Sequence, residues 1–210
     1  EFLTESRAWE DTLRPDRQVV GHTASSRGQA STVLRLLPKA FFSSPGTLGA
    51  YTYTRVNATE AELGKYAGNT FGALKVSYAN ILADLCDLLE AEYKKNGQEV
   101  PVEYNNVRMV LAHDHRIGDA WLDVTHGTYR GFGGYCLPKD VSALIVRGKE
   151  LLATVTSNHP HRAQYEKGLR LLEAMWEYNK ELLASQNLTV EDVSVHDKEW
   201  IEKRVQKYIT

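Results

Sequence analysis

The sequence is poor in cysteine, in net charge and in long apolar runs, and each scarcity excludes a class of protein. Two cysteines among 210 residues do not provide the disulfide framework of a small secreted domain. A net charge of −2 gives no basic field that would attract nucleic acid or an anionic membrane. No apolar run approaches the roughly 20 residues of a membrane span, and no signal-peptide pattern opens the chain. We therefore expect a cytoplasmic globular protein that binds neither nucleic acid nor membrane.

Several short motifs that indicate a cofactor or a nucleophile are also missing. The sequence contains no Gly-x-Gly-x-x-Gly loop for a dinucleotide, no Walker loop and no Gly-x-Ser-x-Gly elbow. His113-Asp114-His115 has metal-binding residue types, but no third ligand stands at a recognisable spacing, so we predict no metal site. The chain begins with Glu1-Phe2-Leu3 rather than methionine, which suggests a segment of a longer protein.

The sequence contains short segments with strand-like patterns, followed by long segments with helical patterns. Asp16 to Gly21 reads as a turn into a strand, Tyr51 to Val56 is a predicted strand, and Gln29 to Leu37 is a predicted helix. From Thr59 to Lys95 there is no proline, and apolar residues at helical spacing predict one helix of about 35 residues. Further predicted helices cover residues 102–112, 138–152, 162–184 and 197–208.

Two features of the long predicted helix leave alternatives open. Its capping box is either Asn57 with Glu60 or Thr59 with Glu62. Gly64, Gly68 and Gly72 are spaced four apart, and each glycine costs about 1 kcal/mol relative to alanine inside a helix. This stripe indicates either the close approach of a backbone or ligand, or loose packing at the surface.

The two cysteines have different expected roles. Cys86 lies among leucines on the long helix, where a cysteine is usually a small buried hydrophobe. Cys136 follows a glycine-rich stretch and precedes Pro138-Lys139-Asp140, which begins a predicted helix. A helix N-terminus and a neighbouring lysine favour the thiolate, so Cys136 is either a reactive nucleophile or a half-buried loop cysteine.

Six short motifs follow one another in an order that resembles one enzyme family. They are Glu1-Phe2-Leu3 with Glu5; Pro15-Asp16-Arg17; Glu62-Leu63-x-Lys65-x-x-x-Asn69; Lys75-x-Ser77-x-x-Asn80; Arg116-Ile117-Gly118; and Gly131-Phe132-Gly133-Gly134-Tyr135-Cys136-Leu137-Pro138-Lys139-Asp140. The ordered set resembles the UDP-glucose/GDP-mannose dehydrogenase family. The last motif is most similar to bacterial members that oxidise UDP-glucose.

The resemblance implies a four-electron oxidation of the sugar C6 of UDP-glucose to UDP-glucuronate by two NAD⁺. Cys136 would be the covalent nucleophile, through a thiohemiacetal and a thioester. Lys65 and Asn69 would stabilise negative charge on the substrate oxygen. Asp140 and Glu1 would assist the hydrolytic water.

The resemblance also implies residues that bind substrate and cofactor. Phe132 and Gly133 would lie on the sugar nucleotide, and Arg116 would reach into the site of a partner subunit in a homodimer. Lys139 and Glu5 would lie near NAD, whose main binding loop is not in this chain. The stretch from Asp119 to Arg130 is longer than is usual in the family, and its role stays open.

The implied fold is mainly α: a central helical dimerisation domain with one very long helix, preceded by an α/β remnant of a Rossmann domain. Residues 1–56 would end the NAD-binding domain, 57–186 would be the central domain with the catalytic cysteine, and 187–210 a helical extension or linker. We expect this chain alone to be incomplete and inactive. The alternatives are a GDP-mannose 6-dehydrogenase and a non-catalytic helical dimerisation module.

Overall fold

The computed structural model describes residues 3–4, 7–15, 17–39, 51–53 and 56–195. By its internal contacts the chain divides into two compact units, residues 1–68 and 69–210. Helices dominate both units and strands are few and short, so the expected mainly α fold is confirmed. The helix predicted at 197–208 lies outside the described residues.

The first unit contains a small α/β element. Strands β1 (Arg17–Val19) and β2 (Tyr51–Tyr53) pair in parallel, with Gln18 opposite Thr52. The segment between them contains the short helix η2 (Arg27–Gln29) and α2 (Ala30–Leu36), and α1 (Ala8–Leu13) precedes β1. The predicted strands and the helix before Pro38 are therefore present, and the helix is one residue shorter at each end than its sequence pattern.

The long helix α3 (Ala58–Lys95) has 38 residues and begins at a complete capping box. The backbone N–H of Glu60 donates to Asn57 Oδ1 at 2.9 Å, and the N–H of Asn57 donates to Glu60 Oε2 at 2.8 Å. These bonds satisfy N–H groups that have no partner inside the helix. Of the two predicted boxes, the one formed by Asn57 is correct, because Thr59 already lies inside the helix.

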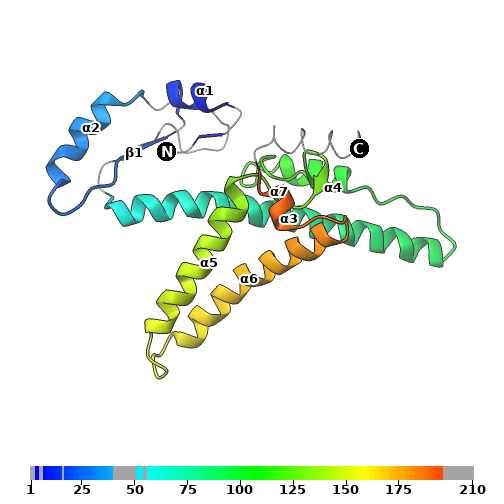
Figure 1. The fold of residues 1–210 in the computed structure, drawn as a ribbon. Helices are drawn as coiled ribbons and strands as arrows, with labels where there is room; N and C mark the ends of the chain where they lie inside the picture. The colour runs from blue at the N-terminus through cyan, green and yellow to red at the C-terminus, as the bar shows by residue number, and fades with distance from the viewer. Residues whose placement is uncertain (1–2, 5–6, 16, 40–50, 54–55, 196–210) are drawn as a thin grey trace, which may run out of the picture. The chain divides into compact units, whose positions relative to one another are not determined.

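In the second unit, two helices pack side by side as a hairpin against α3 (Figure 1). These two helices are α5 (Cys136–Thr154) and α6 (Arg162–Ala184). The other elements of the unit are α4 (Tyr104–Ala112), β3 (Thr125–His126), β4 (Tyr129–Arg130) and α7 (Val190–Val193). The core at their junction consists of buried apolar side chains: Ala73, Val76, Phe132, Leu137, Val141, Ile145 and Met175. Burial of this apolar surface is the main force that holds the helices together.

The helix predicted from Pro138 begins two residues earlier, at Cys136. Proline is often the first residue of a helix, which favoured the later start. Here it is the third residue, where the missing N–H is still one of the four that have no helical partner. Cys136 is therefore the first residue of α5.

The long 119–130 stretch folds over α3 and ends in the β3–β4 hairpin. Leu122 is buried, and its carbonyl accepts a hydrogen bond from the Tyr104 hydroxyl at 2.7 Å. The indole of Trp121 lies against Gly72, where an added Cβ would be 2.9 Å from the ring. A side chain, rather than the expected backbone or ligand, thus makes the close approach at Gly72. A Cβ at Gly64 or Gly68 would meet no described atom within 4 Å, so the expectation of close approach along the whole stripe was wrong.

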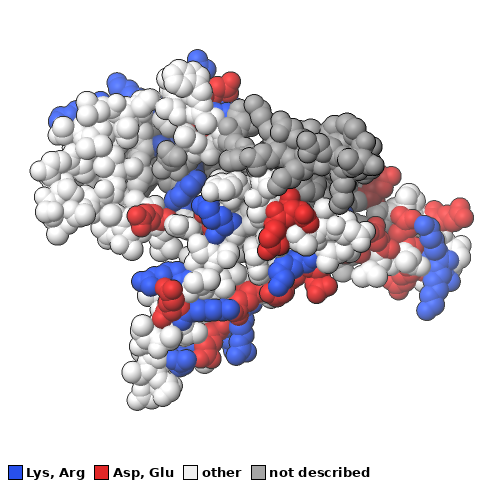
Figure 2. Space-filling view, in the orientation of Figure 1, with Lys and Arg blue, Asp and Glu red and all other residues white. Residues whose placement is uncertain are grey.

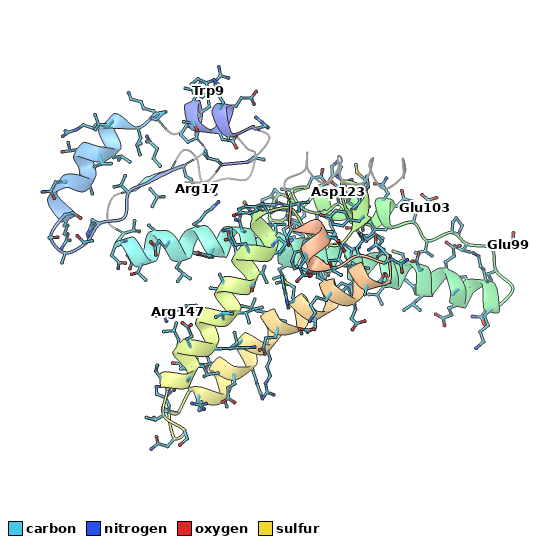
Figure 3. The ribbon with its side chains drawn as sticks, viewed as in Figure 1. Trp9, Arg17, Glu99, Glu103, Asp123 and Arg147 are labelled. Carbon is cyan, nitrogen blue, oxygen red and sulfur yellow. The ribbon has the colours of Figure 1, made fainter. Side chains whose placement is uncertain are left out.

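Charged side chains of both signs are interspersed along α5 and α6 on the face shown in Figure 2. Arg147, for example, lies on the side of α5 that faces away from α6 and pairs with Glu150 at 2.8 Å (Figure 3). None of the helices in the described part of the chain is long and apolar enough to cross a membrane.

Candidate active site

Cys136 lies at the N-terminus of α5, where its thiol is exposed and not in a disulfide. The first backbone N–H groups of a helix have no intrahelical acceptor, and together with the helix dipole they favour an anion. Cys86, in contrast, is buried in α3, as predicted. The thiol available to a ligand among these two is that of Cys136.

Asp140 follows Cys136 by one helical turn, so the two share a face of α5. Its side chain is 1% exposed, yet both carboxylate oxygens have donors. Asn69 Nδ2 on α3 donates to Oδ2 at 2.5 Å, and the Lys139 ammonium donates to Oδ1. A buried carboxylate is costly unless such donors compensate for lost water. The contact also joins α3 to the first turn of α5.

The structure thus brings three of the sequence-predicted residues, Asn69, Lys139 and Asp140, into one cluster beside Cys136. Lys65 lies one turn before Asn69 along α3 and belongs to the first compact unit. Glu1 and Glu5 lie outside the described residues.

Phe132 has its side chain in the core rather than at the surface. It is fully buried, and its ring centroid lies 6.0 Å from that of Trp176 on α6. Gly133 is buried as well, and Gly134 is half-buried. The role predicted for Phe132 and Gly133 stays a prediction.

Arg116 is exposed and forms a local pair with Asp114. Its Nη2 lies 2.6 Å from Asp114 Oδ2, and its Nε donates to Oδ1 at 2.9 Å. These hydrogen bonds hold the pKa of Asp114 well below its usual range, and the same bonds raise the pKa of Arg116. The guanidinium is exposed, and its predicted reach into the site of a partner subunit stays a prediction.

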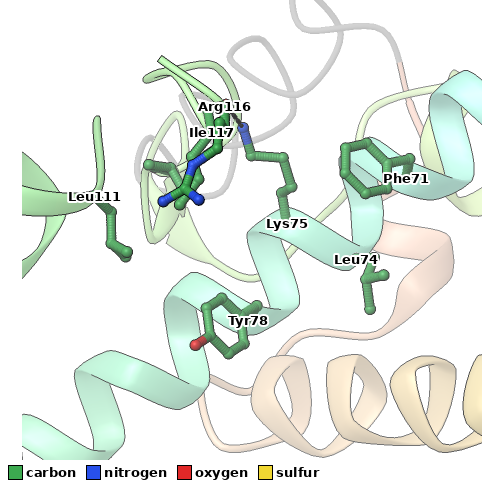
Figure 4. A pocket seen from close by; sticks show the side chains of 8 residues that line it. Phe71, Leu74, Lys75, Tyr78, Leu111, Arg116 and Ile117 are labelled. Atoms are coloured by element: carbon green, nitrogen blue, oxygen red, sulfur yellow. Dashed lines mark hydrogen bonds between the residues drawn. The ribbon is translucent and has the colours of Figure 1, made fainter. Parts of the chain in front are cut away.

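A cavity of about 370 Å³ lies beside Arg116, between α3, α4 and the loop after α4 (Figure 4). Its lining is mostly apolar: Phe71, Leu74, Lys75, Tyr78, Leu111, Arg116, Ile117 and Leu122. Lys75 crosses toward the loop, and its ammonium donates to the Ile117 carbonyl at 3.1 Å. Partial burial lowers the pKa of Lys75. None of the Cys136 cluster lines this cavity, so Arg116 and Cys136 belong to different parts of the unit's surface.

A polar network around Arg130 was not predicted as part of the site. Arg130 Nη2 pairs with Asp84 Oδ1 at 2.7 Å, and its Nε donates to Asn80 Oδ1 at 2.9 Å. Tyr178 on α6 donates to the other Asp84 oxygen at 2.6 Å, and burial with this bond raises the pKa of Tyr178. The sequence signal was Asn80 and Asp84, one turn apart on an otherwise apolar helix face.

The loop after Arg130 is bound by a second unpredicted residue, Asn179. This side chain is 1% exposed, and it interrupts the apolar face of α6 that carries Leu172, Met175 and Trp176. That interruption is the sequence signal for a buried polar contact.

Within the described residues, no group of three His, Cys, Asp or Glu side chains is placed to hold a metal ion.

Comparison with known proteins places this geometry in a family. Residues 59–159 match the central domain of the UDP-glucose/GDP-mannose dehydrogenase family. The chain is 37% identical to the UDP-glucose 6-dehydrogenase of Pseudomonas aeruginosa over 147 residues, which are 69% of this chain and 27% of that protein. It is 35% identical to the Rhizobium meliloti UDP-glucose 6-dehydrogenase over 145 residues, 69% of this chain and 28% of the relative.

Among solved structures, a UDP-glucose dehydrogenase from Pyrobaculum islandicum is similar with a TM-score of 0.55 and 31% identity. That similarity covers 89% of this chain and 35% of the archaeal chain. The chain therefore spans about a third or less of the length of the proteins it resembles.

Proposed function

This chain belongs to the UDP-glucose/GDP-mannose dehydrogenase family, and from that membership we propose that it carries the catalytic centre of a UDP-glucose 6-dehydrogenase. The reaction would convert UDP-glucose into UDP-glucuronate with two NAD⁺. One observation carries the proposal: the exposed thiol of Cys136 at the start of α5, one turn from a buried Asp140 that Asn69 holds.

The proposed chemistry removes four electrons from the C6 alcohol in two steps. The alcohol first loses a hydride and a proton to give an aldehyde. The Cys136 thiolate then adds to the aldehyde carbon, forming a carbon–sulfur bond and a thiohemiacetal. Loss of a second hydride leaves a thioester, and water cleaves the carbon–sulfur bond to give the carboxylate and free Cys136.

Asn69 and Asp140 in the second unit have groups suited to these steps, and the family resemblance adds Lys65 and Glu1. Asn69 and Lys65, one turn apart on α3, would stabilise negative charge on the substrate oxygen. Asp140 is an oriented acceptor that would position the hydrolytic water, with Glu1 as a second carboxylate. From the family resemblance, Phe132 and Gly133 would lie on the sugar nucleotide, and Arg116 would reach into the partner's site.

NAD⁺ would supply the hydride acceptor for both oxidations. The sequence has no glycine-rich dinucleotide loop, so these residues do not form a complete site for it. Lys139, whose side chain is half exposed, is the candidate contact among the described residues, and Glu5 is the other candidate. The parallel β1–β2 pair with α2 between its strands fits the proposal that residues 1–56 end a Rossmann domain.

The protein is also proposed to be a homodimer, with residues 57–186 as its dimerisation domain and 187–210 as an extension or linker. Support comes from the apolar side chains that α3 leaves exposed in the second unit: Phe71, Tyr78, Ile81, Leu85, Leu88 and Leu89. Exposed apolar stripes of this extent are typical of protein interfaces.

The first prediction tests the nucleophile. The protein as encoded, with any residues that precede and follow these 210, is supplied with UDP-glucose and NAD⁺, and NADH formation is followed. We expect two NADH per UDP-glucose, and we expect Cys136→Ser to reduce the rate of UDP-glucuronate formation at least about 10³-fold, because the thioester cannot form.

Cys86→Ala is the matched control, since it removes the other thiol and is expected to retain activity. Full activity of Cys136→Ser would contradict the covalent mechanism. Oxidation of GDP-mannose in preference to UDP-glucose would favour the related sugar nucleotide instead. A folded protein that oxidises neither would be the non-catalytic dimerisation module.

A further inference from the structure

The loop that leads to Cys136 is attached at every second residue to the C-terminal part of the second unit. The N–H of Arg130 donates to Gln186 Oε1 at 2.8 Å, and its carbonyl accepts from Gln186 Nε2 at 3.0 Å. The N–H of Phe132 donates to Asn179 Oδ1 at 2.8 Å, and its carbonyl accepts from Asn179 Nδ2 at 3.0 Å. The N–H of Gly134 donates to the Val193 carbonyl at 2.9 Å.

These contacts resemble the edge of a β-ladder in which side chains replace the partner strand. Alternate residues of a strand point their backbone groups to one side, which is why residues 130, 132 and 134 are the ones bound. Asn179 lies on α6 and Gln186 lies in the turn that follows α6, and the side chains of both face the loop. Both polar atoms of each carboxamide are engaged by the loop.

The glycines of the loop fit this attachment closely. Gly131 has φ +99°, a conformation that side chains disfavour, and a Cβ there would be 2.7 Å from Asn179 Oδ1. A Cβ at Gly133 would be 1.9 Å from the Tyr129 hydroxyl. The loop backbone therefore lies directly against Asn179 and Tyr129, with no room for a side chain at either position.

We propose that Asn179 and Gln186 are positioning residues that set the path of residues 130–134 and, through it, the point at which the chain enters α5 at Cys136. Both residues lie beyond residues 59–159, the part that matches the family's central domain. The kinetic consequence rests on the proposed function: the loop that would lie on the sugar nucleotide leads directly to Cys136, so its path governs both kcat and the KM for UDP-glucose.

The test uses Asn179→Leu, which keeps a similar volume and removes both hydrogen bonds to Phe132. Hydrogen–deuterium exchange is measured on the peptide of residues 131–139, and kinetics are measured with UDP-glucose and NAD⁺. We expect the amides of Phe132 and Gly134 to exchange about 10-fold faster or more. We expect kcat/KM for UDP-glucose to fall about 10²-fold, with a raised KM for UDP-glucose and an unchanged KM for NAD⁺.

Met175→Ala is the matched control, because it weakens α6 packing one turn away and leaves the carboxamide in place. A merely structural role would lower the amount of active enzyme in both variants and leave the KM for UDP-glucose unchanged. Gln186→Leu, at a half-buried position, is the second variant if Asn179→Leu does not fold. Its effects are expected in the same direction and smaller, because it releases Arg130 alone.

Wild-type exchange of residues 131–139 in Asn179→Leu, or wild-type kinetic constants, would overturn the proposal. The exchange measurement does not depend on any substrate. If the unmodified protein fails to oxidise UDP-glucose, the proposed function is wrong, and exchange still decides whether Asn179 holds the loop.

Discussion

Buried polar side chains in this chain differ in whether they have a partner, and that difference sets what each contributes to stability. Asn80 is fully buried, and its amide donates to the Val124 carbonyl at 2.9 Å and accepts from Arg130. Thr70 is also buried on α3, but its hydroxyl has no hydrogen-bond partner among the described residues. A buried hydroxyl without a partner loses its bonds to water and gains nothing in exchange.

Replacing Thr70 by valine is therefore expected to leave the free energy of unfolding unchanged or raise it by up to about 1 kcal/mol. Valine has nearly the same shape as threonine and lacks the hydroxyl that has no partner. The measurement is the free energy of unfolding from urea titration. Asn80→Leu is the contrasting variant and should cost about 2 kcal/mol or more, since it removes the side-chain donor to the Val124 carbonyl and the acceptor of Arg130 Nε. A loss above about 1 kcal/mol in Thr70→Val would mean that the hydroxyl has a partner in solution.

At the scale of elements, the α5–α6 hairpin is held at its turn by one arginine. Arg162, the first residue of α6, donates to the carbonyls of Leu152 and Val155 at the end of α5, and its Nε donates to Glu166 at 2.9 Å. The last carbonyls of a helix have no intrahelical donor, so a cation here satisfies them and complements the helix dipole. Farther along the hairpin, a Cβ at Gly148 would be 2.9 Å from Leu169 Cδ1, so the helices approach closely.

Arg162→Ala is expected to lower the free energy of unfolding by about 1–2 kcal/mol, since it removes the side-chain donor to the Val155 carbonyl and one of the two donors to the Leu152 carbonyl. Chemical denaturation checks this value. Arg147→Ala, which removes an exposed arginine paired with Glu150, is the control and should change stability by less than about 0.5 kcal/mol. Equal losses in the two variants would contradict a specific role for Arg162 at the turn.

The elements that the sequence predicted well are those with a local cause. The bounds of α6 agree with the predicted 162–184 because its apolar residues recur without interruption by proline. The start of α5 was misplaced because a proline pattern cannot distinguish the first helical position from the third. The buried Asp140 and its contact with Asn69 join residues 71 positions apart, so their pairing depends on how α5 packs against α3.

Asn179 shows more clearly which contacts could not be predicted from the sequence. Its place on the apolar face of α6 indicates a buried polar contact, yet nothing local identifies the partner, which lies 47 residues earlier. The family resemblance supplied Cys136, Asn69 and Asp140 as candidates, because those residues stand in short ordered motifs. It supplied no role for Asn179 or Gln186, which stand outside every motif used.

At the scale of the whole molecule, the exposed apolar stripe on α3 predicts self-association. Ile81 and Leu85 lie one turn apart on that stripe and are both largely exposed. We expect the protein to have the mass of a dimer at micromolar concentration, measured by light scattering after size-exclusion chromatography. Ile81→Glu with Leu85→Glu should shift it to a monomer, because a charge buried in an apolar interface without a partner is costly.

Leu171→Glu is the control for this shift, since Leu171 is an exposed leucine on α6 away from the stripe. The control variant should remain a dimer. A strictly monomeric unmodified protein would contradict the dimer proposal, and a monomeric control would show that the effect is not specific to α3.

The attachment of residues 130–134 has a consequence for the order of synthesis. The ribosome makes this loop before it makes the three residues that hold it, Asn179, Gln186 and Val193. A nascent chain that ends at residue 159 already has the sequences of α3 and α5, including Cys136, but none of these attachments. The loop before Cys136, the proposed nucleophile, is therefore fixed late, only when the chain has been released as far as residue 193. Until then the thiol is present without the geometry that would let it react selectively.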